Sequence, residues 1–193
     1  MERKGTTMRH NRIGLGQILV LAGLLACLPA LALGDTNPVG QATTAISQAQ
    51  LARKVRHNLL MLPYYGVFDN LQFEIQGDHV VLSGAVVRPY LKSDAENVVK
   101  RIEGVTGVTN NIKVLPLSRF DDQIRFAEYR AIFGSDSLYR YAMGAVPSIH
   151  IIVDNGHVTL VGVVSNKMDS ILANVAANSV PNVFSVTNKL RIG

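Results

Sequence analysis

Apolar and polar residues alternate along the chain with two periods, one typical of amphipathic helices and one typical of half-buried strands. Leu51, Val55 and Leu59 recur at a helical spacing, whereas Leu71 and Phe73 alternate with polar neighbours. The pattern predicts a helix over 48–62, strands over 71–75 and 80–86, a helix over 89–102 and a strand over 108–114.

The same series of elements is expected a second time. Asp121 and Asp122 suit the N-terminus of a long helix, because acidic side chains favour the positive end of a helix dipole. A pair of catalytic carboxylates is the other interpretation of these two residues. The remaining elements are strands over 149–153 and 158–164 around an Asn155-Gly156 turn, a helix capped by Ser165 or Asn166 and broken by Pro181, and a strand over 183–192.

The two series are copies of one unit. A shift of 78 residues lays 79–84 over 157–162 and 105–110 over 183–188. No gap is needed between 71–114 and 149–192, where 10 of 44 positions are identical and most of the remaining matches exchange one aliphatic residue for another. A repeat of this length indicates a duplicated domain, and two copies are too few for a solenoid.

These patterns predict an α+β protein made of two tandem small α/β sandwiches. Each has the order α-β-β-α-β, with its helices packed on one face of a three-stranded mixed sheet. The expected organisation is a signal peptide over 1–34, a linker over 35–48, a first domain over 49–117 and a second over 121–193. The link over 115–120 is too short for the two domains to tumble freely.

The first 34 residues have the features of a signal peptide. A basic start precedes an apolar run over 13–28, and Ala32 and Gly34 place small residues for cleavage before Asp35. Cleavage before Leu33 and an uncleaved membrane anchor are the alternatives. Cys27 is the only cysteine and follows a passable lipoprotein motif, so the chain is also a possible lipoprotein. The expected location is periplasmic, possibly with attachment to the membrane.

The net charge of +5 is concentrated in the leader. Residues 1–34 carry four of the 19 basic residues and one of the 14 acidic residues, which leaves 15 basic and 13 acidic residues. A near-balanced mature chain gives little support for nucleic-acid binding. No small-molecule substrate is evident from the sequence.

The repeated motif resembles the BON domain, the bacterial OsmY and nodulation domain. The resemblance rests on a Val-x-Leu-x-Gly strand, a helix and then a Gly-Val-x-x-Val-x-Asn segment, matched by 80–84 and 107–111 in the first copy. The second copy matches at 158–162 and 186–188 but departs at Ser185, where the family tends to have glycine. The resemblance implies an envelope protein that binds phospholipid membrane surfaces or protects against osmotic and envelope stress.

We expect no enzyme, no cofactor and no metal site. The four histidines after the leader form no His-x-x-x-His pair, and no cysteine follows Cys27. The sequence also lacks a Gly-x-Ser-x-Gly elbow, a P-loop and a dinucleotide fingerprint.

Four residues that recur in both copies are expected to have structural roles. Gly84 and Gly162 lie on the inward face of a strand, where close packing of a helix is the expected reason for glycine. Close approach of a ligand to the backbone is the alternative. Asn110 and Asn188 alternate along their strands in step with apolar residues, so their side chains should point inward. Each should hydrogen-bond the backbone, because an unpaired buried amide is costly.

Two features of the sequence could support binding. The first is a set of basic residues on the helices of the first copy, which could meet an anionic phospholipid surface or simply form a solvated face among interleaved acidic residues. These lipid-binding candidates are Arg53, Lys54, Arg56, Arg88, Lys92, Lys100 and Arg101. The second is an apolar outer sheet face of the second copy at Ile152, Val161 and Val163, which should pack on the first copy, on the long helix or on another protein.

The sequence favours an exported envelope protein that binds anionic phospholipid surfaces or envelope partners in envelope maintenance or osmotic stress protection. A periplasmic chaperone that binds unfolded clients and a structural adaptor of an envelope assembly are the alternatives.

Overall fold

The computed structural model describes the backbone from Val39 and the side chains from Gln48 to the C-terminal Gly193. The leader expected over 1–34, with Cys27 and its apolar run, lies outside the described residues. Residues 38–193 form one compact unit that contains both copies of the repeat.

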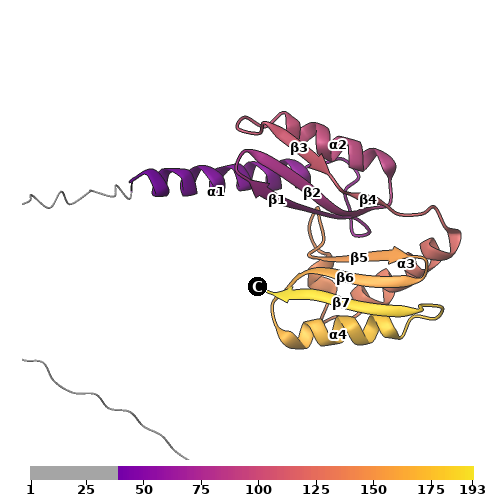
Figure 1. Cartoon of the computed structure of the whole chain (residues 1–193). Coiled ribbons are helices and arrows are strands. Elements are labelled where there is room, and N and C mark those ends of the chain that lie inside the picture. Colours follow the sequence, from indigo (N-terminus) through magenta and orange to yellow (C-terminus); the bar gives the residue numbers. More distant parts are fainter. Residues whose placement is uncertain (1–38) are drawn as a thin grey trace, which may run out of the picture. The chain divides into compact units, whose positions relative to one another are not determined.

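Copy one is the segment from α1 to β4 (Figure 1). Its elements are α1 (Val39–Leu60), β1 (Asn70–Gln76), β2 (His79–Val86), α2 (Pro89–Lys100), β3 (Gly107–Asn110) and β4 (Lys113–Val114). The central strand β2 is antiparallel to β1 and parallel to β3 and β4. Pro89 begins α2, where its missing N–H costs no hydrogen bond.

Copy two is the segment from α3 to β7. Its elements are α3 (Arg119–Phe133), the short 3₁₀ helix η1 (Tyr139–Ala142), β5 (Ile149–Asp154), β6 (His157–Val164), α4 (Lys167–Asn178) and β7 (Ser185–Ile192). The central strand β6 is antiparallel to β5 and parallel to β7, as in copy one. The predicted fold, with two tandem α/β sandwiches of mixed sheets, is confirmed.

Each copy has its own apolar core between its sheet and its two helices (Figure 1). In copy one, Val55 of α1 and Leu91 of α2 lie in one cluster with Leu82 of β2. In copy two, Ile132 of α3 and Ala173 of α4 lie in one cluster with Leu160 of β6, together with other strand residues. Both helices of a copy therefore cover the same face of its sheet.

One position in the core of copy two is a carboxylic acid. The buried stripe of α1 is Leu51, Val55 and Leu59, whereas the stripe at the same spacing on α3 is Ile124, Glu128 and Ile132. Glu128 is fully buried, and neither of its carboxyl oxygens has a hydrogen-bond partner. Burial raises the pKa of this carboxyl from 4.5 to about 8, because ionisation in an apolar site is costly.

The structure differs from the expected element boundaries in three places. Helix α1 begins at Val39, so part of the segment expected to be a linker is helical. The last strand of copy one is divided into β3 and β4 at Asn111-Ile112, where Asn111 N donates to Leu82 O at 2.8 Å. Copy two also contains η1 (Tyr139–Ala142), a short helix that the spacing of apolar residues does not predict.

The two strand glycines are required by backbone geometry. Gly84 has a φ of +112° and Gly162 a φ of +133°, values that L side chains rarely adopt. A Cβ would lie 2.1 Å from Asn70 O at Gly84 and 2.0 Å from Ser148 O at Gly162. The expectation that a helix packs closely against these glycines is wrong, because the backbone at the start of the neighbouring strand makes the close approach.

Candidate binding surfaces

The two copies pack through the outer faces of their sheets. Ile152 of β5 and Val161 of β6 are buried in a cluster with Leu115, and Ala85 and Val87 of copy one pack against that cluster. Copy one thus covers the apolar outer face of copy two at Ile152 and Val161. The third residue of that face, Val163, remains 40% exposed.

A loop of copy one forms a second contact between the copies. The ring of Tyr65 stacks on His150 with centroids 5.5 Å apart, and Nδ1 of His150 lies 3.2 Å from Gly66 O. Ile151 N donates to Val67 O at 2.8 Å. Burial at this contact raises the pKa of Tyr65 to about 12 and lowers the pKa of His150. The two copies are therefore joined by polar contacts as well as by apolar packing.

Some of the basic residues predicted to bind lipid have partners within copy one. Lys100 pairs with Glu96 at 2.5 Å, and Lys54 lies 4.0 Å from Glu103. The Arg88 guanidinium lies over the Tyr64 ring at 5.4 Å from its centroid. Acidic partners and an aromatic ring thus engage part of the set. The remaining members are Arg53 and Arg56 on α1, Lys92 on α2 and Arg101 immediately after α2.

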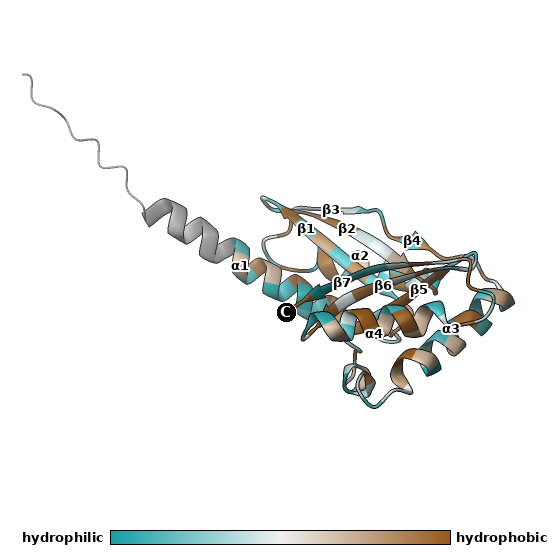
Figure 2. Cartoon of the chain, turned by 90° about the horizontal axis from the view of Figure 1, so that it is seen from below, coloured by the Kyte–Doolittle hydropathy of each residue, from teal (hydrophilic) through white to brown (hydrophobic). Residues whose placement is uncertain are grey.

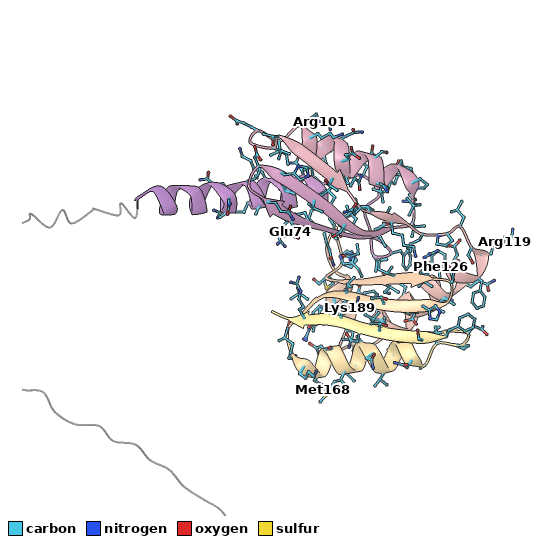
Figure 3. All side chains as sticks on the ribbon, viewed as in Figure 1. Glu74, Arg101, Arg119, Phe126, Met168 and Lys189 are labelled. Carbon is cyan, nitrogen blue, oxygen red and sulfur yellow. The ribbon has the colours of Figure 1, made fainter. Side chains whose placement is uncertain are left out.

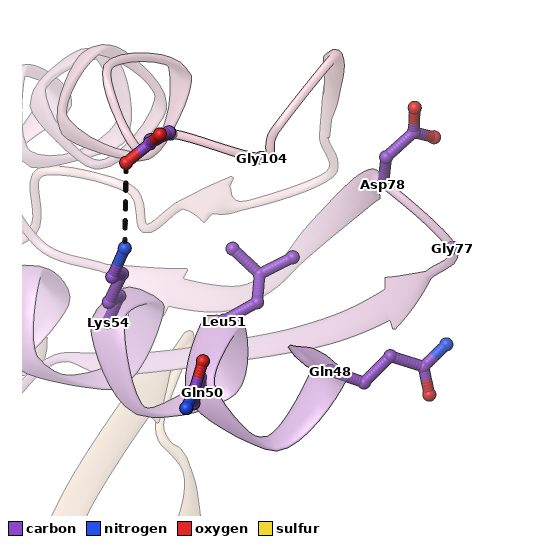
Figure 4. Close-up of a pocket in the computed structure, with 8 residues that line it drawn as sticks. Gln48, Gln50, Leu51, Lys54, Gly77, Asp78 and Gly104 are labelled. Carbon is purple, nitrogen blue, oxygen red and sulfur yellow. Dashed lines mark ion pairs between the residues drawn. The ribbon is translucent and has the colours of Figure 1, made fainter. Parts of the chain in front are cut away.

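Neighbouring cations on α1 face different hollows. Lys54 lines an open pocket of about 340 Å³ together with Leu51, Asp78 and Gly104 (Figure 4), and its Nζ lies 4.0 Å from Glu103. Arg56 instead lines the cleft between the copies. The charge on α1 is therefore divided between two sites, and the pocket at Lys54 contains both signs of charge.

The exposed face of α4 is an apolar stripe, which sequence reasoning missed. The stripe consists of Met168, Ile171, Leu172 and Val175, at 61%, 44%, 37% and 60% exposure. Figure 3 shows Met168 on the side of α4 away from the sheet, and Figure 2 shows most of this helix coloured as hydrophobic. The opposite side of α4 buries Ala173 and Ala177 in the core. Apolar residues of α4 therefore lie both in the core and on its exposed face.

The equivalent helix of copy one is polar at the positions of the stripe. Under the 78-residue shift, Met168, Ile171, Leu172 and Val175 correspond to Tyr90, Ser93, Asp94 and Asn97. The fold therefore does not require apolar residues at these positions. Their 3–4 spacing and their polar counterparts in copy one were the sequence signals for the stripe.

Helix α4 is held rigidly at its N-terminus. Asn166 caps the helix by accepting a hydrogen bond from Asp169 N at 2.9 Å. Asp169 also pairs with Arg140 and accepts a hydrogen bond from the Tyr141 hydroxyl at 2.5 Å. The Tyr141 hydroxyl, the Arg140 guanidinium and the Asn166 amide lower the pKa of the Asp169 carboxyl. The single acidic residue of α4 is therefore directed into the protein and not onto the apolar stripe.

The recurring asparagines tie a strand to a helix in both copies. Asn110 Nδ2 donates to Lys92 O at 2.8 Å, and Asn188 Nδ2 donates to Ser170 O at 2.9 Å. Each side-chain carbonyl accepts a hydrogen bond from the backbone N–H two residues later. In copy two this contact fixes β7 against α4 and so helps to position the stripe.

The adjacent acids Asp121 and Asp122 have separate structural contacts. Asp121 is buried and accepts hydrogen bonds from Asn155 N at 2.9 Å and Gly156 N at 2.8 Å. Asp122 pairs with Arg125 at 2.6 Å. Asp121 therefore fixes the β5–β6 turn to the start of α3, a role beyond the favourable position of an acidic residue at a helix N-terminus.

Among the residues that the structure describes, no cluster of three or more His, Cys, Asp or Glu residues has an arrangement that could hold a metal ion. Within the same residues, no helix combines the length and the apolar character needed to cross a membrane.

The family model for the BON domain matches residues 47–116 and 140–193. These matches fall on the two copies of the repeat, although α3 precedes the second match. No curated protein matches the chain in sequence.

Two of the similar solved structures are of CdsD, a structural protein of the type III secretion system of Chlamydia trachomatis. One, of the C-terminal domain, is 12% identical and covers 74% of this chain and 97% of its own, with a TM-score of 0.27. The other is 13% identical and covers 75% of this chain and 93% of its own, also with a TM-score of 0.27. Scores this low do not establish a common arrangement.

Proposed function

The chain belongs to the BON domain family, and from this premise we propose that it is an exported, non-catalytic envelope protein that docks on phospholipid membrane surfaces. Its role would lie in envelope maintenance or osmotic stress protection. Export is supported by the basic start, apolar run and small residues of the leader over 1–34. After cleavage the chain would occupy the periplasm.

The observation that carries the proposal is the exposed apolar stripe of α4. Helices that lie in a membrane interface combine such a stripe with cations and few exposed acids. Lys167 is exposed at the start of α4, and Arg140 lies at the same end beside Asp169. The exposed positions from 167 to 178 in α4 include no acidic residue, because Asp169 is buried. An anionic bilayer would therefore meet no repelling charge on this face.

The proposal is tested by flotation of residues 35–193 with vesicles of phosphatidylglycerol and phosphatidylethanolamine. The informative variant carries Ile171→Ser, Leu172→Asp and Val175→Asn, which gives α4 the residues of α2 at the equivalent positions. We expect vesicle binding to fall at least about tenfold, because each buried apolar side chain contributes on the order of 1 kcal/mol or more. Circular dichroism checks that the variant is folded.

A matched control changes the same face of α2. The variant with Ser93→Ala and Asn97→Ala should float as the unchanged chain does. Equal flotation of the α4 variant and the unchanged chain would show that α4 is not the docking surface. Failure of the unchanged chain to float, with suppression of aggregation of a denatured client protein, would overturn membrane docking in favour of the chaperone function.

A further inference from the structure

The cleft between the two copies has a chemistry distinct from that of α4. It is an open hollow of about 740 Å³, within the roughly 300–1,000 Å³ typical of small-molecule sites. One wall comes from α1, β1 and Tyr65 of copy one, and the other from β5, β6 and β7 of copy two together with Ser148. The cleft therefore exists only because the two copies are packed together.

Three cations line the cleft. Lys189 and Arg191 lie on β7, and Figure 3 labels Lys189 there, whereas Arg56 lies on α1. Of the described residues that line the cleft, none is acidic, and none of the three cations forms an ion pair with a described carboxylate. Like charges around one hollow repel each other, and an anion placed between them would relieve that repulsion.

Apolar side chains lie beside these cations, together with polar ones such as Gln72 and His150. In the register of β6 and β7, Val161 is paired with Lys189 and Val163 with Arg191, so each of these two cations has a valine beside it on the neighbouring strand. On the other wall, Leu60 is 44% exposed, and the Phe73 ring lies under the Arg56 guanidinium at 6.0 Å. Leu60 and Val163 are large apolar side chains left partly in water at the cleft, and an apolar ligand would cover them.

We propose that this cleft binds one anionic amphiphile with a single acyl chain. The cations Arg56, Lys189 and Arg191 hold its head group, and the apolar side chains that include Leu60 and Val163 cover its chain. The head group is a carboxylate or a phosphate, as in a fatty acid or a lysophospholipid. This ligand is a single molecule taken out of the bilayer, so the site is separate from docking of the protein on a membrane through α4.

The test is calorimetric titration of residues 35–193 with monomeric oleate and with lysophosphatidylglycerol below its critical micelle concentration. Lysophosphatidylcholine, which has the same chain and no net charge, is the reference probe. We expect one saturable site for at least one of the anionic probes, and binding of lysophosphatidylcholine at least about tenfold weaker. Binding of oleate alone, or of lysophosphatidylglycerol alone, identifies the head group. No saturable binding of either, or equal binding of lysophosphatidylcholine, overturns the proposal.

Variants separate the cleft from the rest of the surface. Arg56→Gln and the pair Lys189→Gln with Arg191→Gln should each weaken binding about three- to tenfold, as expected for loss of a partly exposed hydrogen bond to a charged group. Arg53→Gln is the matched control, because Arg53 is an exposed cation three residues away on α1 and outside the cleft lining. Equal loss of binding in Arg53→Gln would show general charge attraction and would overturn the assignment.

Two acidic residues lie near the cleft. Asp69 is buried and accepts hydrogen bonds from Val87 N and Gly66 N, whereas the exposed Glu74 provides a second control. Glu74 is on the exposed side of β1, two residues beyond the cleft residue Gln72, and accepts a hydrogen bond from Gln76 at 3.3 Å. Glu74→Gln should leave binding unchanged or strengthen it, whereas weaker binding would contradict a cation site. Flotation and titration are independent readouts, so the α4 variant should keep amphiphile binding and the cleft variants should keep flotation.

Discussion

Glu128 should make the stability of this protein depend on pH in the direction opposite to that of most carboxylates. Its folded-state pKa of about 8 lies above its ordinary value of 4.5, so the folded chain holds a proton that the unfolded chain has lost between these values. The free energy of unfolding therefore falls as pH rises through this window, by about 1.4 kcal/mol per pH unit. The contribution is intact below pH 4.5 and fully lost above pH 8.

The perturbation that isolates this effect is Glu128→Gln, which keeps the size of the side chain and cannot ionise. The shift from 4.5 to about 8 corresponds to a loss of about 5 kcal/mol at most across the whole window. Between pH 5 and pH 7.5, we expect the free energy of unfolding of Glu128→Gln to rise by about 2 to 4 kcal/mol relative to the unchanged chain. Glu128→Leu should show the same change with pH, because it also lacks the ionisable group.

Urea unfolding of residues 35–193 at pH 5, 6, 7 and 7.5, followed by circular dichroism, measures this difference. Other titrating groups, including Asp69, His150 and Asp169, are present in every variant and cancel in the comparison. Free energies that change in parallel with pH for the unchanged chain and Glu128→Gln would refute the reasoning. In that case the carboxyl would already be ionised, with water or a counter-charge beside it.

Two further predictions concern the sheet of copy two. Gly162→Ala should lower the free energy of unfolding by at least about 2 kcal/mol, because its Cβ would lie 2.0 Å from Ser148 O. Gly66→Ala, with nothing within 4 Å, should cost less than about 1 kcal/mol, and urea unfolding that gives equal losses would contradict the steric explanation. Asn188→Ala removes the hydrogen bonds to Ser170 that link β7 to α4 and, because Asn188 is itself largely exposed, should lower the free energy of unfolding by about 0.5 to 1.5 kcal/mol. Asn178→Ala removes only a hydrogen bond within α4, to Asn174 O, and should change thermal unfolding less. Equal changes would contradict the tie between β7 and α4.

The fold could be predicted because its signals are local and occur twice. Alternation at Leu71 and Phe73 and the spacing of Leu51 and Val55 each specify one element, and the 78-residue shift repeats the order. The backbone hydrogen bond of Asn110 was also predictable, since the alternation of the strand places this amide on the same face as apolar residues. Asn110 does hydrogen-bond the backbone, at Lys92 O.

The binding surfaces were harder to predict because they depend on where separate elements meet. Arg56 and Lys189 are more than a hundred residues apart in sequence, and only the packing of the two copies brings them to one cleft. Lys54, two residues before Arg56, belongs to the same predicted set of cations, yet the turn of the helix directs it towards Glu103. The stripe on α4 was missed for a different reason, since an apolar helical period is ordinarily interpreted as core.

The hydrogen bond from Ile151 N to Val67 O has a consequence for solubility. Strand β5 is at the border of its sheet, where unpaired N–H and C=O groups can recruit a strand of another molecule. The Tyr65–Phe68 loop of copy one shields part of that border, and Phe68 covers it further by packing against Phe126 and Tyr129 of α3. Copy two without copy one would therefore present an unpaired strand edge, so we expect it to aggregate more readily than the two packed copies.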